Sequence, residues 1–127
     1  MKKHLIFTFF LSAALIGLFG CKKTAQEITC NLSAPENQSA VAMTIIYTAT
    51  QTGDGVISSL SYATNSGMIT IQNPSLPWAD TISVITGTKI AISASGTVKN
   101  GMLKVTYQGY GGGSTFQASD FCQHQTD

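Results

Sequence analysis

The sequence contains no arginine, and after the first 20 residues its only histidine is His124. From Cys21 onward there are five lysines and six acidic side chains, so five minus six gives a net charge of about −1. A protein that binds nucleic acid needs a basic face, usually with bidentate arginine donors. The composition therefore excludes a nucleic-acid-binding domain.

Groups that could carry catalysis are also scarce. A hydrolase needs a nucleophile, a base and an orienting group, but His124 lies near the C-terminus among polar neighbours. Asp54, Asp80 and Asp120 fall in a turn, at a strand start and at a strand end, which indicates neither a glycosidase pair nor a calcium site. An enzyme would require one of these carboxylates to meet His124. We therefore expect no enzymatic activity, no metal and no cofactor.

The N-terminal segment has the layout of a secretory signal. The basic start, Met1 to His4, precedes an apolar run from Leu5 to Leu18 that is too short to span a bilayer comfortably. Its end, Leu18-Phe19-Gly20-Cys21, resembles the lipobox of bacterial lipoproteins, in which the cysteine is lipidated and becomes the first residue. An ordinary signal peptide cut near Gly20 and an uncleaved anchor are the alternatives.

This resemblance predicts a signal peptide over residues 1–20 and a lipid on Cys21. Several acyl chains would hold the protein stably, because each buried methylene contributes about 0.8 kcal/mol. The membrane is then one partner of the protein. We expect a lipid-anchored protein of the cell envelope, on the outer membrane and facing the periplasm.

Two cysteines remain, Cys30 and Cys122. An even number of cysteines in an exported protein is typical of a disulfide. A zinc site would need more ligands than His124 supplies, and two free thiols are the other alternative. The compartment favours a Cys30–Cys122 bridge.

The rest of the chain predicts strands and no helix. Residues 21–40 are polar and are expected to form a lipidated tether. From Val41 the apolar positions alternate with period two, and turn residues recur at near-regular spacing. This pattern predicts an all-β, immunoglobulin-like β-sandwich of about seven antiparallel strands over residues 41–122, preceded by the signal-peptide helix and the tether and followed by a tail over 123–127.

The sequence also predicts the form of several connections between strands. The prolines at positions 74 and 77 predict a crossing loop that ends at Trp78. Asn100-Gly101 predicts a hairpin with a type I′ turn, and the glycine-rich stretch 109–113 predicts a flexible loop. Trp78 is expected to cover the core; if it is exposed beside Tyr110, the two aromatics would form a contact for a ligand or partner.

The order of motifs over residues 41–108 resembles the MmpS family and its small lipoprotein relatives. The resemblance rests on Gly53-Asp54-Gly55, a Ser-Tyr strand ending at Asn65-Ser66-Gly67, Leu76-Pro77-Trp78, the strand from Ile90 to Ala94, and Asn100-Gly101. It implies an immunoglobulin-like sandwich that acts beside an envelope transporter. The chain departs from the family by having Cys21 in place of a membrane-spanning helix.

These observations lead to two expectations for function. The first is a non-catalytic accessory or binding module of an envelope complex, with a transporter or another envelope protein as partner. The alternative is a stand-alone lipoprotein that binds a small molecule or glycan through Trp78 and Tyr110. An exposed Trp78 would favour the alternative.

Overall fold

The computed structural model describes residues 26–126, which form ten β-strands. Two four-stranded antiparallel sheets and a small two-stranded sheet account for all of them. The predicted antiparallel β-sandwich is therefore confirmed. The predicted signal peptide and Cys21 lie outside the described residues.

The strands follow one another with short connections. Their bounds are β1 Ile28–Ser33, β2 Asn37–Gln38, β3 Met43–Gly53, β4 Val56–Thr64, β5 Gly67–Gln72, β6 Trp78–Val84, β7 Lys89–Ile90, β8 Ile92–Val98, β9 Gly101–Gly111 and β10 Ser114–His124.

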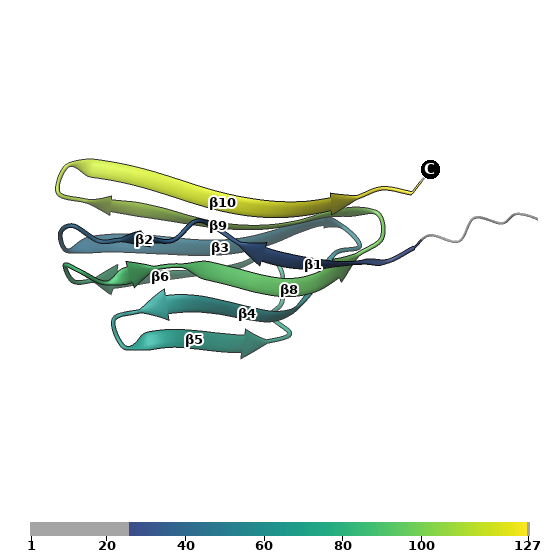
Figure 1. The fold of residues 1–127 in the computed structure, drawn as a ribbon, viewed down its shortest axis with the longest axis horizontal. Coiled ribbons are helices and arrows are strands. Elements are labelled where there is room, and N and C mark those ends of the chain that lie inside the picture. The colour runs from purple at the N-terminus through teal and green to yellow at the C-terminus, as the bar shows by residue number, and fades with distance from the viewer. Residues whose placement is uncertain (1–25, 127) are drawn as a thin grey trace, which may run out of the picture.

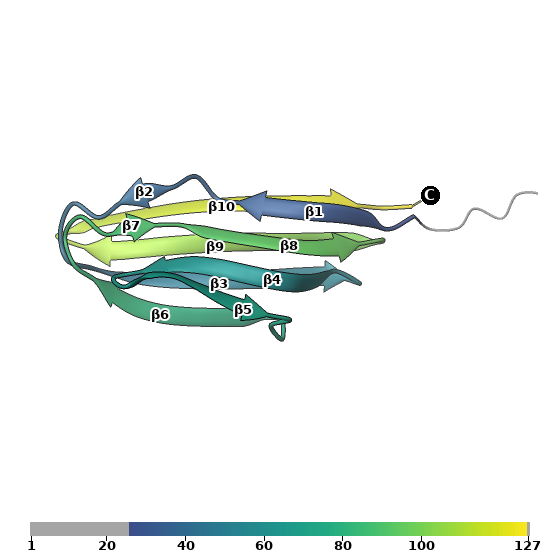
Figure 2. The same cartoon turned by 60° about the horizontal axis from the view of Figure 1, so that its bottom comes forward.

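Two layers make up the sandwich (Figures 1 and 2). Sheet 1 has the strand order β1-β8-β4-β5, sheet 2 has the order β10-β9-β3-β6, and β2 pairs with β7. Alternate residues of each strand face the other layer, as the period of two predicts. On β3, for example, Ile45, Tyr47 and Ala49 are fully buried, while Ile46 and Thr48 between them are only partly covered.

The sandwich begins earlier than the sequence suggested. Both β1 and β2 lie inside the segment expected to be a tether, and β10 extends to His124, into the expected tail. The reason is visible in the pattern of β1, where Cys30 and Leu32 are buried between exposed neighbours. Two apolar residues with polar neighbours on each side are enough to cover one edge of the core, but they are a weak sequence signal.

A β-bulge changes the inward face of β4. The register against β8 shifts between Ile57 and Ser59, so Ser58 is the extra residue. Before the bulge Ile57 is buried and Val56 is exposed; after it Leu60 is buried. Strict alternation along this strand would place Val56 on the same face as Leu60, but the inserted residue puts Ile57 there instead.

The expected Asn100-Gly101 hairpin is also wrong. β8 belongs to sheet 1 and β9 to sheet 2, so these residues carry the chain from one layer to the other. Positive φ occurs at Gly101 but not at Asn100, whereas a type I′ turn needs it at both central residues. Gly101 instead pairs with Gly53, where β3 leaves sheet 2 for sheet 1.

The type I′ geometry lies at the glycine-rich stretch, which is not a flexible loop. β9 and β10 pair without interruption from Gly101 to Gly111, and only Gly112 and Gly113 turn the chain, with φ of 59° and 77°. Positive φ at two consecutive residues fits a tight two-residue hairpin, and glycine adopts it without steric cost. Tyr110 consequently sits on a strand and has a defined direction.

The two ends of the sandwich differ. Ile28 pairs with Val98, and His124 pairs with Gly101. The start of β1 and the end of β10 therefore both lie where β8 crosses to β9. We call this the crossover end and the opposite one, with the Gly112-Gly113 turn, the hairpin end (Figure 1). Eleven residues of β9 at about 3.4 Å each separate the two ends by about 37 Å.

Candidate binding surface on sheet 2

A line of five aromatic rings runs through the core. The order is Trp78, Tyr62, Tyr47, Tyr107 and Phe116, with neighbouring ring centroids 5.1 to 6.3 Å apart. Such tilted and edge-to-face contacts add to the free energy of burial. The expectation that Trp78 covers the core agrees with its place in this line, where it is partly buried.

Two tyrosine hydroxyls of this line donate hydrogen bonds to backbone carbonyl groups. Tyr47 donates to the carbonyl oxygen of Ala63 on the other sheet at 2.9 Å, and Tyr107 donates to the carbonyl of Pro35. Burial raises the pKa of Tyr47 to about 12 and also raises the pKa of Tyr107. These hydroxyls are structural donors rather than acids available for catalysis.

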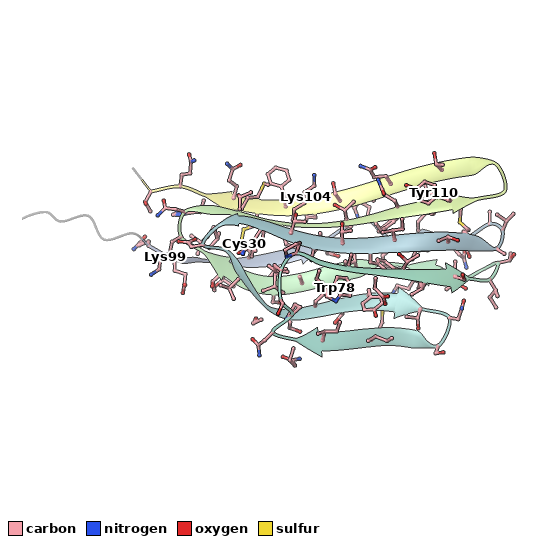
Figure 3. All side chains as sticks on the ribbon, turned by 180° about the vertical axis from the view of Figure 1, so that it is seen from behind. Cys30, Trp78, Lys99, Lys104 and Tyr110 are labelled. Carbon is pink, nitrogen blue, oxygen red and sulfur yellow. A yellow bond between two sulfur atoms is a disulfide. The ribbon has the colours of Figure 1, made fainter. Side chains whose placement is uncertain are left out.

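Trp78 and Tyr110 do not meet. Trp78 pairs with buried Ala49 and therefore faces the core, whereas Tyr110 pairs with Thr44 and Thr115 on the outer face of sheet 2. Figure 3 shows the two side chains on different strands of the molecule. The prediction of a ligand or partner contact formed by both aromatics is therefore wrong. Tyr110, which is 42% exposed, remains a candidate contact residue.

Asp54 holds the crossover end together. Its Oδ1 accepts hydrogen bonds from the backbone N–H groups of Lys99 and Asn100, both at 2.9 Å. These donors lower the pKa of the Asp54 carboxyl because they stabilise its charged form. Asp54 therefore ties the β3–β4 crossing to the β8–β9 crossing, and its glycine neighbours serve this close approach.

The other candidate acids and His124 also form hydrogen bonds within the fold. Asp80 accepts from the Tyr62 hydroxyl at 2.6 Å, and Asp120 accepts from the backbone N–H of Ser33 at 2.9 Å. The Nδ1 atom of His124 lies 2.8 Å from the carbonyl oxygen of Lys99. Each of these groups bonds to a backbone or tyrosine group and not to another of them. Within residues 26–126 no three metal-ligating side chains gather into a site.

The Cys30–Cys122 disulfide is present and joins β1 to β10. These are edge strands of different sheets, so the bond closes one side of the sandwich (Figure 3). Closing a loop across 92 positions of sequence limits the unfolded chain. The chain-entropy description gives a stabilisation of about 4 to 5 kcal/mol for a loop of this size.

The outer face of sheet 2 is a plane of uncharged polar side chains. Threonine, glutamine and serine dominate its four strands, and among the described residues Lys104 is the one charged side chain on it. The face also carries two exposed aromatics, Tyr110 near the hairpin end and Phe121 beside Lys104. An array of this kind offers many hydrogen-bonding groups and little charge.

Three side chains of this face form a hydrogen-bonded row. The Tyr110 hydroxyl donates to Oε1 of Gln108 at 3.1 Å, and Nε2 of Gln108 donates to Oε1 of Gln117 at 3.0 Å. Gln108 and Gln117 are direct cross-strand partners on β9 and β10. With Thr115 and Phe116 they line an open hollow of about 450 Å³.

A second hollow lies on the outer face of sheet 1. It measures about 270 Å³ and is lined mainly by serines, together with Asn31. Several of these hydroxyls bond to one another or to the sheet, for example Ser61 with Thr70 at 2.8 Å and Ser95 with Asn31 at 3.3 Å. Because no aromatic side chain lines it, this hollow offers less contact area than the one beside Tyr110.

The sequence pointed to Tyr110 but not to Gln108 and Gln117. Gln108 could be placed on the outer face, because it alternates with the inward residues Val105 and Tyr107. Gln117 depends on the register of β10 against β9, which the expected flexible loop left undefined. The signal that was available is the run of three glycines from Gly111 to Gly113, which predicts a two-residue turn as readily as a loop.

Comparison with known protein families, with curated protein sequences and with solved structures found no match. The resemblance to the MmpS family therefore stays a prediction. Over residues 26–126 there is also no helix long and apolar enough to cross a membrane.

Proposed function

We propose that the protein is a non-catalytic binding module, held at a membrane by a lipid on Cys21 and presenting its far end to a partner in the cell envelope. One observation carries the proposal. The chain enters the sandwich at the crossover end, where Ile28 pairs with Val98, and the hairpin end lies about 37 Å away. An anchor before residue 26 would therefore direct the hairpin end away from its point of attachment.

Exposed apolar side chains support the same orientation. Seven large apolar side chains are exposed in the described part of the chain, and five lie toward the hairpin end. The most exposed of them is Ile85, at 66%, and Val41 lies against Gly112 in the hairpin turn. Apolar side chains gathered at one end of a small domain are typical of a protein-binding surface.

The state of the candidate acids agrees with a binding role. Asp54, Asp80, Asp120 and His124 each bond to a backbone or tyrosine group and not to one another. A reaction would require one of them to leave its partner and approach another. A transporter component or another envelope protein is the partner class that we propose, and the outer membrane, on its periplasmic side, is the proposed location.

Site-specific photocrosslinking in intact cells tests this proposal. A photoreactive amino acid at Ile85 or Val41, both at the hairpin end, should give a discrete adduct with an envelope protein. The matched probe at Val56, an exposed apolar residue at the crossover end, should give none. Absence of adducts from both hairpin-end positions, with the protein present at normal abundance, would contradict the accessory role.

The anchor has its own test. Changing Cys21 to Ser should move the protein from the membrane fraction to the soluble envelope fraction, because one or more acyl chains would be lost. Changing Cys30 and Cys122 to Ser together is the matched control, since it replaces two other cysteines without affecting the proposed anchor. Retention of the Cys21→Ser protein in membranes would rule out lipid attachment at this residue.

A further inference from the structure

We propose that Tyr110, Gln108 and Gln117 form a subsite for a neutral saccharide on the outer face of sheet 2. The inference rests on the proposed binding role and specifies a chemical class of ligand. It does not require that the partner protein and the saccharide occupy the same surface.

The Tyr110 ring is placed to receive a flat ligand. Tyr110 and Gln108 are two residues apart on β9 and point to the same side, about 7 Å apart along the strand. Since the Tyr110 hydroxyl reaches Oε1 of Gln108 at 3.1 Å, the ring leans along the sheet. A sugar ring carries C–H groups on one face, and these pack on the electron-rich face of an aromatic ring.

The neighbouring groups suit hydroxyl ligands. Gln108 uses its carbonyl oxygen for Tyr110 and donates to Gln117, so the row is held in place before a ligand arrives. Among residues 26–126 the Gln117 Nε2 atom has no protein acceptor, and the Thr115 hydroxyl lines the same hollow. Amides and hydroxyls provide both donors and acceptors, which matches a sugar hydroxyl, itself both donor and acceptor.

Charge decides against ionic ligands. The nearest charged side chain along β9 on this face is Lys104, six residues from Tyr110 and therefore about 20 Å away. An anion or a cation at Tyr110 would lose hydration without gaining a partner of opposite charge. A neutral ligand avoids this cost, and the hollow of about 450 Å³ is within the size range of small-molecule sites.

Binding to a panel of neutral oligosaccharides tests the subsite. The probes are the hexamers of β-1,4-glucose, α-1,4-glucose, β-1,4-mannose, β-1,4-xylose and β-1,4-N-acetylglucosamine, titrated by calorimetry into the full chain in a detergent without a sugar head group. At least one should bind, and Tyr110→Ala should weaken that binding by about tenfold or more, as expected for loss of an aromatic anchor. Tyr110→Phe should lose less, because it retains the ring.

Phe121→Ala is the matched control, since Phe121 is an exposed aromatic on the same face but near Lys104. It should leave saccharide affinity unchanged, and an oligogalacturonate should not bind the wild-type protein. The side-chain amide signals of Gln108 and Gln117 should shift on titration in NMR spectra. No binding of any of the five hexamers, or binding that Tyr110→Ala leaves unchanged, would overturn the inference.

Failure of the saccharide subsite and failure of the proposed accessory role give different experimental outcomes. If no saccharide binds while Ile85 still gives an envelope adduct, only the subsite is wrong. If saccharide binding depends on Tyr110 but no adduct forms and Cys21→Ser has no effect on fractionation, the accessory role is wrong and the subsite stands.

Discussion

The Tyr62 hydroxyl donates a hydrogen bond to Oδ2 of Asp80 at 2.6 Å, and this contact joins the two layers of the sandwich. Tyr62 lies on β4 of sheet 1 and Asp80 on β6 of sheet 2. The same tyrosine ring packs against Trp78 at a centroid distance of 5.1 Å. The Tyr62 side chain therefore provides a hydrogen-bond donor for the Asp80 carboxylate between the layers, and its ring links Trp78 to the other aromatic rings of the core.

Removing this hydroxyl should destabilise the fold. We expect Tyr62→Phe to lower the free energy of unfolding by about 1.5 to 3 kcal/mol, the range for a hydrogen bond to a charged group. Urea titration followed by circular dichroism measures the change. Tyr110→Phe removes a hydroxyl from the surface and should cost about 0.5 kcal/mol or less. Equal losses in the two variants would contradict the role given to Asp80.

Stability should fall in alkaline solution. Burial and, for Tyr62, the neighbouring Asp80 raise the pKa values of Tyr47 and Tyr62 to about 12 from an ordinary value of 10.0. A raised pKa means that the folded protein holds these protons more tightly, so their contribution is complete below pH 10.0 and is lost between there and about 12. Each group contributes a slope of up to about 1.4 kcal/mol per pH unit.

Urea midpoints measured from pH 8 to 12 should show this decline. Tyr62→Phe should be less stable at pH 8 yet have a shallower decline, because one of the tyrosines with a raised pKa is gone. A midpoint that stays constant across the range, with tyrosine ionisation followed by absorbance, would show that Tyr47 and Tyr62 titrate alike in the folded and unfolded states.

Asp54 should contribute to stability in the opposite pH range. Its lowered pKa means that its contribution is complete above the ordinary value of 3.8 and is lost as the pH falls through the folded-state pKa. Asp54→Ala should lower the melting temperature at pH 7. Asp54→Asn should lower it less, since an amide oxygen can still accept from Lys99 and Asn100, and should flatten the acid dependence.

Glu27→Gln is the matched control for Asp54. Glu27 is an exposed carboxylate just before β1, and its replacement should leave both the melting temperature and the acid branch nearly unchanged. An acid branch of Asp54→Asn that overlays the wild-type curve would mean that the crossover contact does not depend on charge.

Loss of the disulfide should cause the largest decrease in stability among these variants. Replacing Cys30 and Cys122 by Ser should lower the free energy of unfolding by about 2 to 5 kcal/mol, because the unfolded chain regains the freedom of a long loop. Chemical denaturation with and without reductant measures the loss, and alkylation of the native protein should modify neither cysteine. Cys21→Ser should leave stability unchanged; modification of both Cys30 and Cys122 without reductant would contradict the bond.

Part of the candidate site could be predicted and part could not. The outward direction of Gln108 and the scarcity of charge follow from alternation and composition. The adjacency of Gln108 to Gln117 could not be predicted, because it depends on whether the glycines form a loop or a two-residue turn. The separation of Trp78 from Tyr110 also required the sheet, since only cross-strand pairing shows that they face opposite sides.

Three properties of this protein follow from local sequence patterns: the class of fold, the inward faces of β3 and β9, and the scarcity of catalytic groups. These properties are local, because a strand alternates its side chains with a period of two wherever it lies. Three further properties depend on how the strands pair: β8 and β9 belong to different sheets, β1 completes the core, and Tyr110 lies beside two glutamines. Each of these depends on pairing between strands far apart in sequence, which is set by how the two layers bury their apolar faces together and not by any short run of residues.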